Sequence, residues 1–66
     1  MAALPVPDAY AVFTKDVGGW WAFKGIAVDK EGALRLLELH KHEPHVIEIV
    51  VLELPTGHRA YEWSKT

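Results

Sequence analysis

Four segments of the chain carry the apolar patterns of β-strands, and a fifth carries that of a helix. The strand-like segments are rich in aromatic and β-branched residues, which suit extended backbone. Gly18-Gly19 separates the first two and suits a tight hairpin turn. The strands are expected at residues 9–15, 20–28, 45–54 and 58–63. This order predicts an α+β fold of the form ββαββ, an antiparallel sheet of about four strands with one helix packed on one face.

The helix is expected to begin after Asp29, whose carboxylate can accept hydrogen bonds from the first free backbone N–H groups. It should end near His42, because Pro44 disfavours helical backbone at the residue before it. At about 100° per residue, His40 lies within the apolar arc and His42 lies on the polar side. The arc consists of Ala33, Leu36, Leu37 and His40, with Leu34 and Leu39 at its edges.

The third expected strand, IEIVVLEL, has two glutamates five positions apart, so strict alternation places Glu48 and Glu53 on opposite faces. A β-bulge at Val50-Val51 would bring both glutamates to solvent. It would also direct four apolar residues of this strand to the core: Ile47, Ile49, Leu52 and Leu54. The alternative is a regular strand with two mostly buried faces, which needs a second layer or a dimer partner.

Size and composition indicate one small globular domain. Half of the 66 residues are hydrophobic and 24% are charged. We expect an extended arm at residues 1–8, the domain at 9–63 and a tail at 64–66. The chain has no cysteine, so disulfides and thiolate metal sites are excluded and stability must come from packing, a dimer or a partner. The sequence has neither a signal peptide nor a long apolar run, which predicts a cytoplasmic protein outside membranes.

The charge pattern argues against nucleic-acid binding. The formal net charge is −2, and the seven Lys/Arg are scattered without a basic stripe. The aromatic residues are more informative, since Trp20 and Trp21 are adjacent and a strand would direct them to opposite faces. They either fill the core and its edges or form a protein-contact patch. The candidates for protein contact are Trp20, Trp21, Tyr10, Tyr61 and Trp63.

The segment HKHEPH, residues 40–45, is the remaining candidate for chemistry. Two helical residues at i and i+2 do not face each other, so His40 and His42 should diverge. We interpret the cluster as side chains that complement the negative end of the helix. A metal site at His40, His42 and His45 requires the last turn to unwind. Neither a Ser or Cys nucleophile beside a base nor a phosphate loop is present, so no catalytic residue and no cofactor are predicted.

Residues 10–42 show a partial resemblance to a known family. YAVFTKDVGGWWA, followed by DKEGALRLLELH, resembles the hairpin and helix that begin HicB-type antitoxin domains. The chain departs from that pattern after the helix, where it has HVIEIVVLEL and HRAYEW instead of the family's third strand. It is otherwise similar to small accessory proteins of phages and mobile elements. The resemblance implies a small protein that neutralises a partner.

Two functions therefore remain open. The first is a non-catalytic protein-binding module, an inhibitor, antitoxin or host-factor binder that acts by occlusion. The alternative is a small metal-dependent or enzymatic module that uses the histidines at the helix end. A protein partner or a homodimer is expected, with residues 58–63 as a sheet edge that pairs across a two-fold axis and Trp63 as its anchor.

Overall fold

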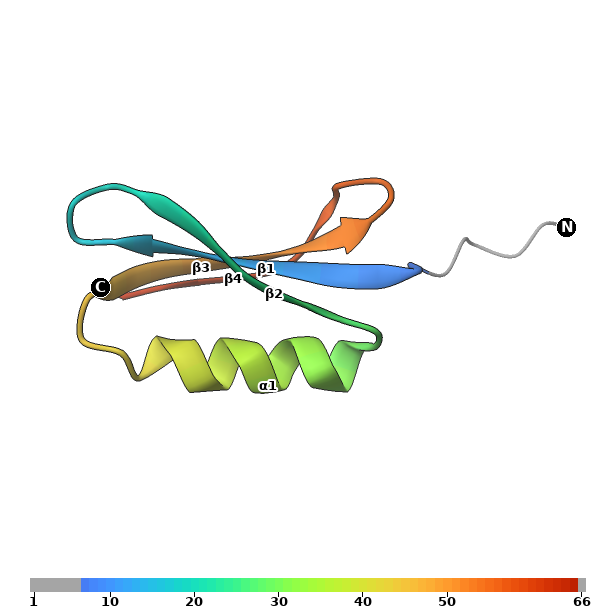
Figure 1. Cartoon of the computed structure of the whole chain (residues 1–66), viewed down its shortest axis with the longest axis horizontal. Coiled ribbons are helices and arrows are strands. Elements are labelled where there is room, and N and C mark those ends of the chain that lie inside the picture. The colour runs from blue at the N-terminus through green and yellow to red at the C-terminus, as the bar shows by residue number, and fades with distance from the viewer. Residues whose placement is uncertain (1–6, 66) are drawn as a thin grey trace, which may run out of the picture.

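The computed structural model describes residues 7–65, which form one antiparallel sheet and a helix (Figure 1). The elements are β1 (Ala9–Asp16), β2 (Trp21–Ala27), α1 (Lys30–Lys41), β3 (Val46–Leu54) and β4 (Arg59–Ser64). The strand order is β2-β1-β3-β4. The α+β class and the ββαββ order predicted from the sequence are confirmed. Residues 1–6 of the expected arm lie outside the described residues, and β4 includes Ser64 of the expected tail.

Two aspartate side chains fix the backbone, one in the β1–β2 turn and the other at the start of α1. In the β1–β2 turn, Oδ1 of Asp16 accepts hydrogen bonds from the backbone N–H groups of Gly18 and Trp20, at 2.9 and 3.1 Å. Gly19 has a φ of 87°, a conformation that favours glycine. At the start of α1, Asp29 is the N-cap, and its Oδ1 accepts from the N–H of Gly32 at 2.8 Å. The predicted turn and helix start are both confirmed.

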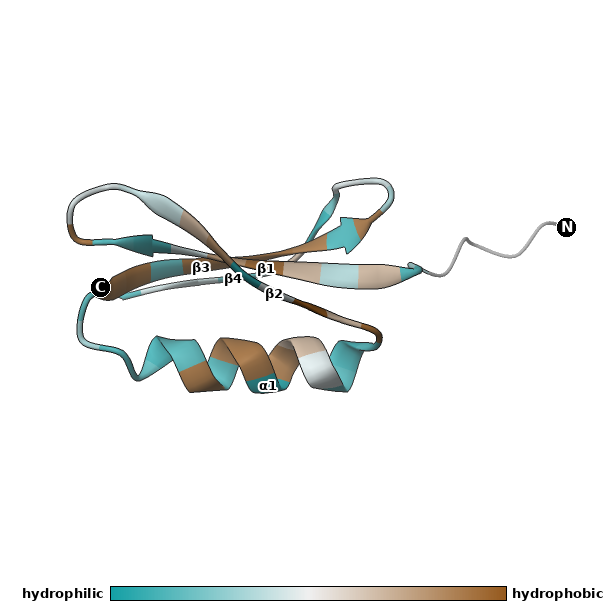
Figure 2. Ribbon diagram, viewed as in Figure 1, coloured by the Kyte–Doolittle hydropathy of each residue, from teal (hydrophilic) through white to brown (hydrophobic). Residues whose placement is uncertain are grey.

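The core lies between α1 and one face of the sheet (Figure 1). The helix packs on β1, β2 and β3. The apolar residues of β3 and of the middle of α1 that build this layer appear as brown segments in Figure 2. The buried cluster consists of Val12, Ala27, Ala33, Leu37, Val46, Ile49 and Val51. The other face has no helix over it among residues 7–65.

Of the two interpretations of this strand that the sequence left open, the bulge at Val50-Val51 is wrong. The register between β1 and β3 runs without interruption from Ala9 opposite Leu54 to Lys15 opposite Glu48. The irregularity between β3 and β4 lies in β4, where Ala60 is the extra residue. Alternation therefore holds through the middle of β3, so Glu48 and Glu53 lie on opposite faces, as the alternative interpretation requires.

This register also corrects the residues assigned to the core. Ile49 and Val51 face α1, as members of the buried cluster, and Val50 and Leu52 face the other side of the sheet. Leu54 lies on that side as well, opposite Ala9. β3 is thus a strand with two apolar faces, and α1 covers one of them.

Candidate binding surface on the open face of the sheet

The sheet face opposite α1, which we call the open face, is built from all four strands. Directly paired residues share a face, so the register identifies its members. Phe13 lies between Phe23 and Val50, and Ala11 lies between Ile26 and Leu52. Lys15 lies between Trp21 and Glu48. On β4, Arg59 lies opposite Leu52 and Glu62 lies opposite Val50. The face is therefore apolar across β2, β1 and β3, and charged along β4 and one end.

Aromatic side chains form the β2 half of the open face. The rings of Phe13 and Phe23 are 5.5 Å apart between centroids and tilted by 55°, a favourable geometry for an aromatic pair. Nζ of Lys15 lies 5.8 Å from the ring centroid of Trp21, within cation–π range. These contacts favour one arrangement of the rings, which lowers the entropy that they lose when another molecule binds.

Within the open face, the exposed apolar area concentrates on β2. Trp21 is 48% exposed, and Phe23 and Ile26 are each 57% exposed. By contrast, Ala11 and Val50, on the same face, are nearly buried by their neighbours. A hollow of about 210 Å³ opens beside the aromatic residues. It is lined by Phe13, Trp21, Val50, Leu52 and Arg59.

The charged residues of the open face are paired within the chain. Nζ of Lys15 lies 3.4 Å from Oε2 of Glu48, and Arg59 hydrogen-bonds Glu62 through Nη1 and Oε1. Two positive and two negative groups therefore border the apolar area, and their charges cancel. Such a surface favours apolar contact over the recognition of a strongly charged ligand.

The five aromatic residues predicted to contact a protein do not lie together. Trp21 is on the open face, but Trp20 precedes β2 in the turn and is 76% exposed. The expectation that Trp20 and Trp21 point to opposite faces of one strand is wrong, because Trp20 is not part of the strand. Tyr10, Tyr61 and Trp63 are half-buried on the helix side of the sheet, packed against the core.

Three large apolar residues of β1 and β2 that lie on the open face were not among those candidates: Phe13, Phe23 and Ile26. Alternation along β2 places Phe23 with Trp21 from the sequence alone. Ile26 joins them because the register shifts opposite Val12 and Phe13, which leaves Lys24 as the extra residue of β2. In the sequence, a glycine inside a strand indicates such a shift. In the structure, Gly25 has a φ of 153°, a value that favours glycine.

At the end of α1, Glu43 lies between two of the histidines. His40 Nδ1 hydrogen-bonds Glu43 Oε1, and Nε2 of His45 lies 3.3 Å from Glu43 Oε2. The hydrogen bond from His40, aided by the positive charge of His40, His45 and Lys24, lowers the pKa of Glu43 below its ordinary value of 4.5. This arrangement forms a link between the helix end and the loop before β3.

His42 points away from this link. Its side chain is 75% exposed and its Nε2 lies 3.9 Å from Glu38 Oε2, whereas the side chain of His40 is 14% exposed. The helical wheel predicts this divergence. Among residues 7–65, no three His, Cys, Asp or Glu side chains are grouped so that they could hold a metal ion.

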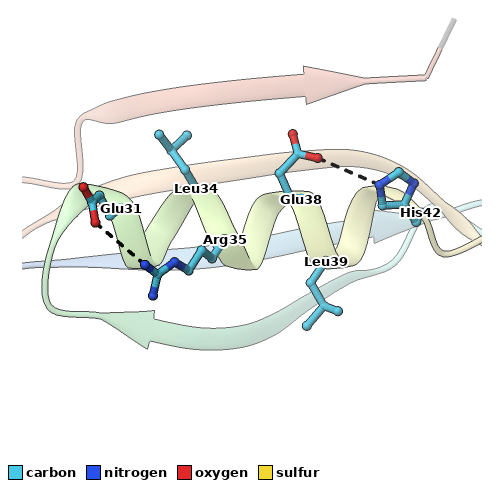
Figure 3. A pocket seen from close by; sticks show the side chains of 6 residues that line it. All are labelled: Glu31, Leu34, Arg35, Glu38, Leu39 and His42. Carbon is cyan, nitrogen blue, oxygen red and sulfur yellow. Dashed lines mark ion pairs between the residues drawn. The ribbon is translucent and has the colours of Figure 1, made fainter.

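The outer side of α1 is a charged surface (Figure 3). Glu31 pairs with Arg35 at 3.8 Å, in the same i, i+4 relation as Glu38 and His42. Leu34 and Leu39 lie among these residues and point to opposite sides of the helix in Figure 3. Exposed ion pairs of this kind contribute little to stability, typically about 0–1 kcal/mol. We interpret this side of the helix as a solvent-exposed surface.

In the part of the chain that the structure describes, no helix is long and apolar enough to cross a membrane. Comparisons of the chain with protein-family models, with curated proteins and with solved structures found no match. The resemblance of residues 10–42 to HicB-type antitoxins therefore stays a prediction.

Proposed function

We propose that the chain is a small non-catalytic protein-binding module that contacts its partner through the open face of the sheet. The observation that carries the proposal is the apolar surface of Trp21, Phe23 and Ile26, each about half exposed, on a sheet face that no helix within residues 7–65 covers. Contiguous apolar surface with a polar border is typical of protein interaction sites.

The open face combines an aromatic anchor, an arginine and a polar rim, which are features of protein interfaces. Trp and Tyr anchors, with Arg, dominate the binding energy of protein interfaces, and Trp21 and Arg59 line the same hollow here. The paired charges of Lys15–Glu48 and Arg59–Glu62 form the polar rim around the apolar centre. A partner would place an apolar side chain in the hollow and exclude water from the aromatic residues.

A module of this size acts by covering a surface of its partner. The resemblance to antitoxin domains and to phage accessory proteins supports an inhibitor, an antitoxin or a host-factor binder that works in the cytoplasm. The alternative metal-dependent or enzymatic function is not favoured, because the carboxylate of Glu43 is already engaged by His40 and His45 and His42 points elsewhere.

Photo-crosslinking in the native host tests this proposal. A benzophenone amino acid replaces Phe23 on the open face in one variant and Leu39 on α1 in the matched control. Both side chains are more than half exposed, at 57% and 63%, so they differ in location and not in accessibility. We expect position 23 to capture a discrete protein that position 39 does not. Equal capture from both positions, or capture from position 39 alone, would contradict the proposal.

A further inference from the structure

The open face has the exposed apolar area of a small dimer interface. Large aromatic side chains have areas of about 150–250 Å² each, and the side chains of Trp21, Phe23 and Ile26 are about half exposed. Half of that area for each gives about 225–375 Å² of exposed apolar surface for the three side chains together. Half-buried residues and the charged rim surround them, so a dimer through this face would be a small one, below the ~800 Å² per partner of a standard interface.

We propose that a second copy of this chain covers the open face, so that two sheets pack face to face about a two-fold axis. The inference rests on the proposed function, because it names the molecule that occupies the same surface when no other partner is bound. It implies that a target protein competes with the second copy for the aromatic residues of β2.

The face carries both an exposed ring and a hollow that fits it, as a two-fold interface requires. In a two-fold interface, if residue i of one copy contacts residue j of the other, then residue j of the first copy contacts residue i of the second. Phe23 is 57% exposed and does not line the hollow, but its ring packs beside that of Phe13, which does. The hollow of about 210 Å³ exceeds the ~150 Å³ of a protein cavity that holds benzene, so it has room for a phenyl ring. Phe23 of each copy can therefore enter the hollow of the other.

The charges of the open face do not repel a second copy of the same chain. Lys15 pairs with Glu48 and Arg59 pairs with Glu62, so these four residues give the described part of the face no net charge that would repel its copy. Because these ion pairs form within one chain, association should depend mainly on apolar contact and only weakly on salt.

The edges of the sheet are less suited to this contact than its face. Edge strands that must not pair with other chains often carry charges and bulges. β4 has Arg59, Glu62 and the extra residue Ala60, and β2 has Lys24 as its extra residue. Pairing across the β4 edge with Trp63 as its anchor is also disfavoured, because Trp63 packs against the protein's own core.

Sedimentation velocity over about 1–200 µM tests the inference. We expect the wild type to shift from monomer to dimer across this range. Phe23→Glu should raise the dimer Kd by about 30-fold or more, as for an interface hot spot. Leu39→Glu, which places the same charge on an equally exposed site of α1, should change it by less than about 3-fold.

Leu52→Trp provides a second test that does not add charge. It fills the hollow and increases the apolar area, so it should weaken the dimer if Phe23 enters the hollow and strengthen it if the association is unspecific. If circular dichroism shows that Phe23→Glu is unfolded, this variant decides the question. A wild type that remains monomeric at about 200 µM would overturn the inference, as would a dimer that Leu52→Trp strengthens.

The dimer and the proposed function can fail separately. A monomer whose position 23 still crosslinks to a different protein in the host would refute the second copy and leave the binding module standing. A dimer that meets these expectations, with no other protein captured from position 23, would support the second copy and refute a heterologous partner.

Discussion

Truncation of Leu37 to alanine should lower the free energy of unfolding by about 3 kcal/mol. Leu37 is 8% exposed and belongs to the cluster between α1 and the sheet. Removal of its outer carbons loses about 0.8 kcal/mol for each buried CH₂ group, and the cavity that remains adds to this cost. Since a chain of 66 residues has a total stability of about 3–10 kcal/mol, the loss is readily measured.

Leu39→Ala is the matched control, because it makes the same chemical change two residues along the same helix. Leu39 is 63% exposed, so its truncation should change stability by less than about 0.5 kcal/mol. Urea unfolding, followed by tryptophan fluorescence at one protein concentration, measures both variants. Equal losses for Leu37→Ala and Leu39→Ala would refute the orientation of α1 on the sheet.

Three further predictions concern α1 and its ends. His40→Ala should cost about 1–3 kcal/mol and His42→Ala almost nothing, since only His40 is largely buried; equal midpoints in urea would contradict this assignment. The lowered pKa of Glu43 stabilises the fold above pH 4.5, and this contribution is lost as the pH falls below that value. Glu43→Gln should therefore reduce the acid sensitivity seen in thermal melts from pH 7 to pH 3, and an unchanged profile would refute it. Asp29→Ala should cost about 1 kcal/mol through loss of the N-cap, and helix content by circular dichroism should remain after the change.

The order of elements could be predicted from the sequence because each boundary has a local chemical cause. Asp29 caps the helix, Pro44 follows its end, and Gly18-Gly19 permits the first hairpin. Each of these signals depends on residues within a few positions of the chain. The divergence of His40 from His42 is of the same kind, since helical geometry alone determines it.

Which residues form the open face depends on the register of the strands, and no local sequence pattern specifies that register. In β3 the sequence left two alternatives, and the uninterrupted pairing of β1 with β3 decided for two apolar faces. In β2 the extra residue Lys24 brings Ile26 onto the face of Trp21 and Phe23, whereas strict alternation places Ile26 on the other face. The position of Trp20 in the turn likewise depends on where β2 begins to pair with β1.

The central claim is that the open face binds a protein through the aromatic residues of β2. Its most direct test is the affinity of the captured partner for the wild type, Phe23→Ser and Leu39→Ser, measured by calorimetry with the purified proteins. We expect Phe23→Ser to weaken binding by about 10-fold or more and Leu39→Ser to change it by less than about 2-fold. Equal losses, or a larger loss for Leu39→Ser, would contradict the account.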